Sequence, residues 1–236
     1  MDLRQRIPRR HSRSLRFLRL LSAGVARLPR ITSPALATKR GVFLYRMFYN
    51  GTTDMKLIFL KHTSTDWDDS GRIKGQTDVG LNATGRDEAR HLAERLRDFK
   101  IELIVSSDLS RARETAEIIR AALGVGAPVR LESNLHECSF GQLEGLTKEQ
   151  ALGKFGPELA GDWEDQHLAY NFRPFGGESR DEVLARHQAA LQALAAESPD
   201  QPILIVGHGR GLTTLLATLG HSPTIKKNEF YLVEVK

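Results

Sequence analysis

The sequence has 236 residues and a mass of 26.4 kDa, which is enough for one sizeable α/β core or at most two small domains. Its composition, with 40% apolar and 27% charged residues, is typical of a globular chain and excludes a collagen-like or wholly disordered one. A single cysteine, Cys138, excludes an intramolecular disulfide and an all-cysteine zinc site, and no uninterrupted apolar run of about 18 residues could cross a membrane.

The formal net charge of +5 is unevenly distributed. Residues 1–54 carry 12 Lys/Arg against Asp2 and Asp54, whereas residues 55–236 carry 22 Lys/Arg against 27 Asp/Glu. The basic character therefore belongs to the first segment, and the rest of the chain gives no electrostatic reason to expect a nucleic-acid partner.

Residues 1–54 are predicted to be a basic extension, either disordered or involved in targeting or in contact with an anionic membrane surface. An alternative is translated sequence upstream of a start at Met47 or Met55. Residues 15–28 alternate apolar and arginine side chains in a weakly amphipathic helical pattern. The protein itself is expected in the cytoplasm. The apolar members of this pattern are Leu15, Phe17, Leu18, Leu20, Leu21, Val25 and Leu28.

From Met55 onward, short apolar runs alternate with helical periods, which predicts one domain over residues 55–236. This alternation is typical of a three-layer α/β/α sandwich with a mainly parallel sheet. Strands are expected at 55–61, 103–106, 129–131, 203–206 and 230–235, and helices at 84–99, 109–123, 179–196 and 211–219, with a shorter one opening at Thr147. Capping boxes that begin with Thr147 and Ser179 mark two of the helix starts.

Two of the predicted strands lead directly into a histidine. His62 follows the apolar run 57–60, and His208 follows the run 203–206. Parallel α/β sheets bind ligands beyond the carboxyl ends of their strands, so both imidazoles are expected at one edge of the sheet. Either histidine alone could equally be a packed structural residue.

Charged residues follow the same strand ends. Lys61 precedes His62, Arg111 comes shortly after the second strand and Glu137 follows the third. Cations and helix N-termini neutralise a phosphate dianion, a neutral imidazole can attack phosphorus, and a carboxylic acid can protonate the leaving oxygen. The pattern predicts a phosphate site that needs no metal or other cofactor.

Six segments in this order resemble the signature of the histidine phosphatase superfamily, the phosphoglycerate-mutase-like group, over essentially all of residues 55–236. Each motif is weak alone, but the series is specific because every motif falls at an expected strand end. The segments are Lys61-His62-Thr63, Gly71–Leu81, Ser107–Thr115, Leu135–Glu137 with Phe140–Gly145, Gly176–Ser179 and Val206–Gly209.

The resemblance implies a role for each matching residue. His62 would be the nucleophile that forms a phosphohistidine, and Glu137 the proton donor and then the base for water. Arg111, His208 and Lys61 would bind phosphate, with His208 as a charged donor. Arg72 could also bind phosphate, although a solvated loop arginine is an equal alternative.

The chain departs from the family pattern at two positions of the first motif. Lys61 replaces an arginine, which keeps the positive charge but loses the planar fork, at an expected cost of about 1–3 kcal/mol in phosphate binding. Thr63 replaces a glycine, as in members that resemble alpha-ribazole phosphatases, and needs a backbone angle that a β-branched residue tolerates.

The segment between Gly145 and Gly176 has only 30 residues, which is short compared with the insertion of cofactor-dependent phosphoglycerate mutases. We therefore expect a metal-independent phosphomonoesterase of the broad-specificity phosphatase branch, acting on a small phosphorylated metabolite. Sugar phosphate, glycerate phosphate, alpha-ribazole phosphate and nucleotide monophosphate remain open, as does the oligomeric state. The alternatives are a degenerate protein that binds phosphorylated ligands without turnover, because of Lys61, and a phosphoglycerate mutase.

Two glycine-rich segments invite nucleotide-binding interpretations. Residues 207–211 read Gly-x-Gly-x-Gly rather than the dinucleotide fingerprint, and residues 80–85 lack the Lys and Ser/Thr that should follow a P-loop. Neither interpretation is favoured.

Other polar residues lack a motif role. Arg113 should point away from Arg111 on the same helix, and Glu144 could either cover the site or be a structural loop residue. Histidines and tryptophans predicted to pack or lie at the surface are His91, His136, His167, His187, His221, Trp67 and Trp163.

Overall fold

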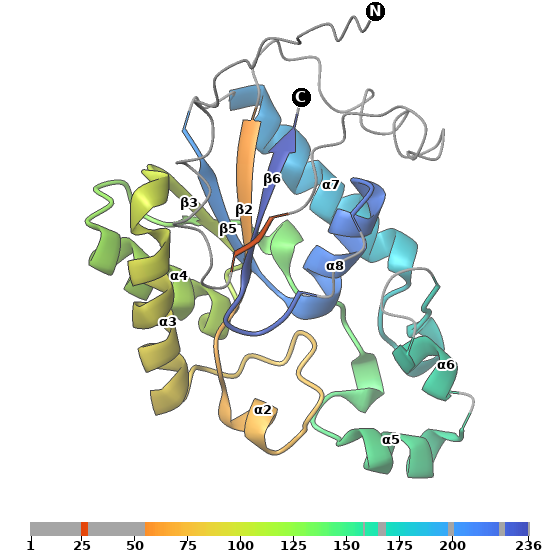
Figure 1. The fold of residues 1–236 in the computed structure, drawn as a ribbon. Coiled ribbons are helices and arrows are strands. Elements are labelled where there is room, and N and C mark those ends of the chain that lie inside the picture. The colour runs from red at the N-terminus through yellow and green to blue at the C-terminus, as the bar shows by residue number, and fades with distance from the viewer. Residues whose placement is uncertain are drawn as a thin grey trace, which may run out of the picture.

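In a computed structural model, described over residues 25–27, 55–157, 159–164, 169–197, 201–221 and 225–235, one twisted sheet lies between helices (Figure 1). Its strand order is β1-β6-β2-β5-β3-β4. Only the β2–β6 pair is antiparallel among these neighbours, so the predicted mainly parallel sheet is confirmed. The strands are β1 Val25–Arg27, β2 Met55–Lys61, β3 Leu103–Ser106, β4 Arg130–Leu131, β5 Ile203–Gly207 and β6 Phe230–Val235.

Strand β1 corrects part of the helix expected over residues 15–28. Val25 pairs with Phe230 and Arg27 with Leu232, in parallel register. The outer edge of β6 presents backbone N–H and C=O groups that a short strand can satisfy, and this outweighs a weak amphipathic pattern. The rest of that predicted helix lies outside the described residues, and the role of residues 1–54 stays a prediction.

Helices cover both faces of the sheet, which gives the expected three layers (Figure 1). Strand β2 shows why, because its successive side chains point to opposite faces. Ile58 and Leu60 pack with α3 (Ala83–Leu96) and α4 (Ser110–Leu123), whereas Leu57 and Phe59 pack with α7 (Arg180–Glu197) and α8 (Gly209–Thr218). All four of these side chains are fully buried.

Several helix ends follow from local signals. The Ser179 hydroxyl accepts from the amide of Glu182, whose carboxylate accepts from the amide of Ser179 at 2.9 Å, so the predicted capping box opens α7. Helix α3 ends at Leu96 and continues as the 3-10 turn Arg97–Phe99, earlier than expected. Helix α8 begins at Gly209, two residues earlier than expected, directly after His208.

A third apolar cluster lies below the carboxyl ends of the strands and consists of Ile73 together with side chains between residues 138 and 183. It includes α5 (Lys148–Phe155), opened by the predicted Thr147 capping box, and α6 (Leu159–Glu164). Short turns that the sequence pattern did not reveal are α2 Asp66–Asp69 and the 3-10 turns Ser133–Leu135, Gly141–Leu143 and Arg173–Phe175. In the described part of the chain, no helix combines the length and apolarity that a membrane span requires.

Candidate active site

The register of β2 and β5 brings the two strand-end histidines together. Lys61 pairs with Gly207, and the amide of His62 donates to the Gly207 carbonyl at 2.9 Å. His62 and His208 therefore leave adjacent parallel strands at the same level, with ring centroids 5.3 Å apart and ring planes tilted by 55°. They lie at one shared edge, as the sequence predicted, and both side chains are buried there.

The imidazole of His62 is oriented and neutral. Its Nδ1 lies 2.7 Å from the carbonyl of Thr63, and since a carbonyl only accepts, Nδ1 carries the proton and Nε2 the lone pair. Burial, followed by the charges of Lys61 and Arg111, lowers the pKa of His62 well below its usual value. A neutral ring with a free Nε2 lone pair is the form that can act as a nucleophile.

His208 is also buried, and its Nε2 lies 2.9 Å from the hydroxyl of Ser107. Burial lowers its pKa, and the charge of Arg111 lowers it further. Full burial beside a guanidinium therefore disfavours a second cation at this position, and the charged donor expected toward a bound phosphate stays a prediction. Nδ1 of His208 has no hydrogen-bond partner among the described residues.

Arg111, in the first turn of α4, is fully buried. Its Nη1 donates to the Thr77 carbonyl at 2.9 Å and its Nη2 to the Gly75 carbonyl at 2.6 Å, while Nε has no partner within the described chain. Burial lowers the pKa of Arg111, but the group stays a cation because its ordinary pKa lies above 12. Two main-chain anchors aim this buried charge, as a phosphate ligand requires.

Lys61 ends β2 and reaches across to the start of α8. Its Nζ lies 3.8 Å from the position that a Cβ would occupy at Gly209. The amide groups at a helix N-terminus and an ammonium group attract the same anion, so this placement agrees with the predicted phosphate-binding role.

Lys74 is a buried cation that the sequence motifs do not predict. Its Nζ donates to Asp68 at 2.7 Å, and the two side chains are only 13% and 16% exposed. Burial lowers the pKa of Lys74 against the opposing effect of Asp68, and its charge contributes to the lowered pKa of His62. The residue lies in the predicted Gly71–Leu81 motif at a variable position, so the motif itself carried no signal for it.

Thr63 fits its position without strain. Its amide and its hydroxyl both contact the hydroxyl of Thr115, at 3.2 and 3.1 Å, and Thr115 donates to the carbonyl of Arg111 at 2.7 Å. Among described residues other than glycine, only Lys100 and Asn228 have positive φ. The threonine therefore ties the nucleophile's strand end to the helix that carries Arg111.

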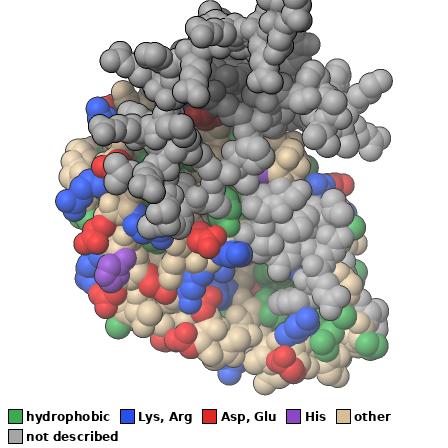
Figure 2. All heavy atoms as spheres, viewed as in Figure 1, with side chains coloured by type: hydrophobic (Ala, Val, Ile, Leu, Met, Phe, Trp, Pro, Cys, Tyr) green, Lys and Arg blue, Asp and Glu red, His purple; other side chains and the backbone are tan. Residues whose placement is uncertain are grey.

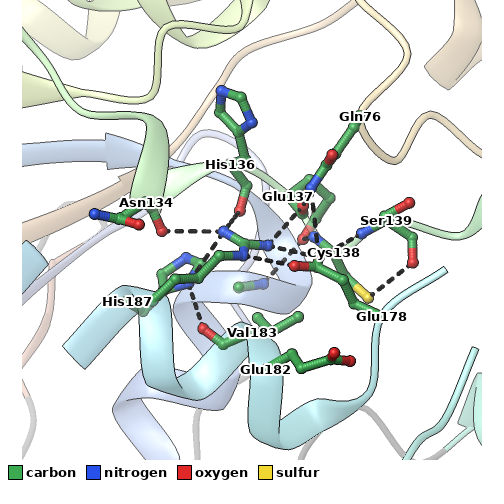
Figure 3. A network of polar contacts seen from close by, with 12 residues as sticks. Gln76, Asn134, His136, Glu137, Cys138, Ser139, Glu178, Glu182, Val183 and His187 are labelled. Atoms are coloured by element: carbon green, nitrogen blue, oxygen red, sulfur yellow. Dashed lines mark hydrogen bonds and ion pairs between the residues drawn. The ribbon is translucent and has the colours of Figure 1, made fainter. Parts of the chain in front are cut away.

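Glu137 lies against the N-terminus of α8 (Figure 3). Its Oε1 accepts from the amides of Gly211 and Cys138, both at 2.9 Å, and its Oε2 accepts from the amide of Arg210 at 3.2 Å. The structure therefore brings the predicted acid to the helix that begins just after His208. All three donors are backbone N–H groups, so both carboxyl oxygens act as hydrogen-bond acceptors here.

Two loop residues have structural contacts. Arg72 is exposed, and its Nη1 donates to the carbonyl of Gly145 at 2.5 Å, a contact between two loops that is compatible with the solvated-loop alternative. The carboxylate of Glu144 accepts from the amides of Gln76, Thr77 and Phe140, at 3.1, 2.8 and 2.9 Å. Of the two alternatives for Glu144, these contacts fit the structural one. Its carboxylate holds the loop whose carbonyls accept from Arg111.

The remaining candidates agree with packing or surface positions where they are described. Arg113 and His91 are exposed, while His187 and His221 are buried. His136 pairs with Asp108 at the surface, Trp67 is half-buried, and His167 and the side chain of Trp163 lie outside the described residues. The described residues contain no group of three or more His, Cys, Asp or Glu arranged to bind a metal.

On the face shown in Figure 2, acidic and basic side chains are interspersed over the described part of the chain and do not merge into one basic patch. This agrees with the charge count for residues 55–236, in which acids exceed Lys and Arg.

The three-layer fold carries two buried histidines and buried cations at the carboxyl edge of its sheet. This is the fold of phosphoglycerate-mutase-like phosphatases. The fold resembles that of a mycobacterial glucosyl-3-phosphoglycerate phosphatase in complex with VO3, with a TM-score of 0.66 and 32% identity over 75% of this chain and 92% of that one.

The chain belongs to the histidine phosphatase superfamily (branch 1), which matches residues 57–232. It is 35% identical to phosphoglycerate mutase-like protein 4 of Arabidopsis thaliana over 68% of this chain and 69% of that protein. It is 34% identical to glucosyl-3-phosphoglycerate phosphatase of Mycobacterium tuberculosis over 70% of this chain and 74% of that protein. The predicted family and fold are confirmed.

Proposed function

We propose that this protein is a metal-independent phosphomonoesterase that hydrolyses a small phosphorylated metabolite through a phosphohistidine at His62. One observation carries the proposal: a buried, neutral His62 whose Nδ1 is committed to the Thr63 carbonyl, beside the cations Lys61, Lys74 and Arg111. An imidazole in this state is a nucleophile, and its neighbours match the charge of a phosphate dianion.

In the first step, Nε2 of His62 attacks phosphorus and the bond from phosphorus to the ester oxygen breaks. The leaving oxygen takes a proton from Glu137, and the phosphoryl group becomes bonded to Nε2. Arg111 and Lys61 neutralise the phosphoryl oxygens, and His208 donates a hydrogen bond to them.

In the second step, the Glu137 carboxylate removes a proton from water, and the resulting nucleophile attacks phosphorus. The bond from phosphorus to Nε2 breaks, phosphate leaves, and both His62 and Glu137 return to their starting protonation states.

The names of the relatives guide the choice of substrates to test. One relative is named a glucosyl-3-phosphoglycerate phosphatase and another a phosphoglycerate mutase-like protein, so phosphate esters of glycerate and of its glycosides should be included. Sugar phosphates, alpha-ribazole phosphate and nucleotide monophosphates complete the panel.

The test measures phosphate release by the full chain from p-nitrophenyl phosphate and from the panel, with His62→Ala as the control. We expect the variant to lose about 10⁴-fold or more in kcat, and acid-labile phosphate to be trapped on the wild-type protein alone. Equal rates for the two proteins would favour a protein that binds phosphorylated ligands without turnover. Transfer of phosphate within a glycerate phosphate, without release, would favour a mutase.

A further inference from the structure

The side chain of Arg186, on α7, binds the main chain that carries Glu137. Its Nη1 donates to the carbonyls of Asn134 at 3.0 Å and His136 at 2.6 Å, and its Nη2 donates to the carbonyl of Glu137 at 2.9 Å. One guanidinium thus holds three carbonyls within four residues of chain. The dashed lines in Figure 3 show these contacts converging from Asn134, His136 and Glu137.

Glu178 completes the arrangement from the other side. Its two carboxylate oxygens accept from Nε and Nη2 of Arg186, both at 2.9 Å, and its Oε2 also accepts from the amide of Ser139 at 2.8 Å. The pair therefore fixes the chain on both sides of Glu137. The Arg186 and Glu178 side chains are only 16% and 20% exposed, so little water competes for these bonds.

Gln76 connects this network to the phosphate-binding side of the site (Figure 3). Its Nε2 donates to the Glu137 carbonyl at 3.2 Å, while the carbonyls of its neighbours Gly75 and Thr77 accept from Arg111. The loop 75–77, which binds Arg111, therefore also contacts the main chain of Glu137.

A partly buried ion pair is weak evidence for stability, because the cost of desolvation offsets much of the attraction. The geometry of its hydrogen bonds explains better why an arginine stands at position 186. The planar guanidinium offers five N–H donors in fixed directions, and they bind three carbonyls and a carboxylate. A lysine would keep the charge but could not span these acceptors.

We propose that Arg186 is a positioning residue for Glu137, fixing the acid loop so that the carboxyl group meets the leaving oxygen and the attacking water. This inference rests on the proposed function, in which Glu137 moves those protons. Displacement of a reacting group by about 1 Å can cost about 10²-fold in rate, so loosening the loop should be visible in kinetics.

The experiment compares Arg186→Lys with the wild type in the full chain, using p-nitrophenyl phosphate and phenyl phosphate. Arg173→Lys is the matched control, because Arg173 makes a two-bond pair with Glu182 near the start of α7, at 2.9 and 2.7 Å, and this pair is exposed. We expect Arg186→Lys to slow phosphoenzyme formation, measured by rapid quench, about tenfold or more on phenyl phosphate, the poor leaving group, and severalfold less on p-nitrophenyl phosphate. KM should change less than about twofold, and the control should match the wild type.

The decisive comparison adds Arg186→Lys to Glu137→Gln. If Arg186 acts through Glu137, the second substitution costs no more than about twofold in the double variant, whereas independent effects would multiply. Multiplying effects, equal losses of phosphoenzyme formation on the two substrates, or an unchanged rate of phosphoenzyme formation would each overturn the positioning role.

Should Arg186→Lys fail to fold, Glu178→Gln decides instead, because glutamine keeps an acceptor for Arg186 and removes the charge. The same leaving-group dependence would support the role, and its absence would overturn it. A wild-type protein no faster than His62→Ala would reject the proposed function itself, an outcome distinct from all of these.

Discussion

The two halves of the candidate site are positioned by different kinds of interaction. His62 and His208 follow adjacent strands, whose pairing places them at the same level with ring centroids 5.3 Å apart. Glu137 lies on a loop after β4, and polar side chains from residues 76, 178 and 186 hold that loop. The nucleophile therefore depends on the sheet, and the acid depends on contacts between segments far apart in sequence.

This difference predicts different responses to substitution. Removing the strand-end nucleophile should abolish phosphoryl transfer while the sheet remains intact, because the backbone of β2 makes the register. Perturbing the acid loop should change how efficiently protons move, so its effects should depend on the leaving group.

The largest of the remaining effects is expected for Glu137→Gln. Glutamine keeps an oxygen that can accept from Gly211 or Cys138, so the loop should stay in place while the proton donor and base are lost. We expect kcat on phenyl phosphate to fall about 10²-fold or more, with a smaller loss of phosphoenzyme formation from p-nitrophenyl phosphate. Rapid-quench measurement of the phosphoenzyme and steady-state rates on both substrates check this. Equal losses in phosphoenzyme formation on the two substrates would remove Glu137 as the acid.

The strand-end half could be predicted from the sequence because it follows local rules. Two apolar runs that each lead into a histidine are sufficient, since parallel strands end at a common edge. Lys74 could not be predicted, because only the folded loop brings it to Asp68 and into the electrostatic surroundings of His62. Arg186 was missed for the same reason, since its carbonyl acceptors lie some fifty residues earlier in the chain.

The motifs also led to expectations about His208 and Arg72 that depend on the surroundings of each side chain. A charged His208 was expected from its role toward phosphate, but the sequence could not show that this ring is fully buried beside Arg111. Arg72 had the residue type of a phosphate ligand, yet its contact with the Gly145 carbonyl follows from the path of the loop. Residue identity predicted which chemical groups are available, whereas their burial and contacts depend on packing that the sequence does not show.

A second prediction concerns stability at low pH, where the buried histidines should destabilise the folded chain. Burial lowers the pKa of His187 to about 3, and burial also lowers those of His62 and His208. The unfolded chain therefore binds more protons than the folded one below about pH 6.5, so the free energy of unfolding should be constant above about pH 7 and decrease as the pH falls. Each such histidine contributes a slope of up to about 1.4 kcal/mol per pH unit.

Urea unfolding between pH 5 and 8 measures this slope. His187 offers a variant outside the proposed chemistry, because its Nδ1 donates to the Val183 carbonyl at 2.8 Å and its ring packs against Gly211. His187→Gln should reduce the slope by about one proton while destabilising the protein at pH 8. A slope unchanged by this substitution would show that other groups dominate the acid limb.

The smallest predicted effect tests the departure of this chain from its family at position 61. Lys61 offers one ammonium point charge near the start of α8, whereas arginine would offer two parallel donors to two phosphate oxygens. Lys61→Arg should raise kcat/KM about fivefold, corresponding to about 1 kcal/mol for one added charged hydrogen bond. Lys61→Met should lower kcat/KM, because the positive charge is lost.

An unchanged or lower kcat/KM for Lys61→Arg would mean that Lys61 and Lys74 together already neutralise the phosphate as well as the arginine does elsewhere in the family. In that case Lys74→Met, which also leaves Asp68 without its ammonium partner, should cost more in the wild type than in Lys61→Arg.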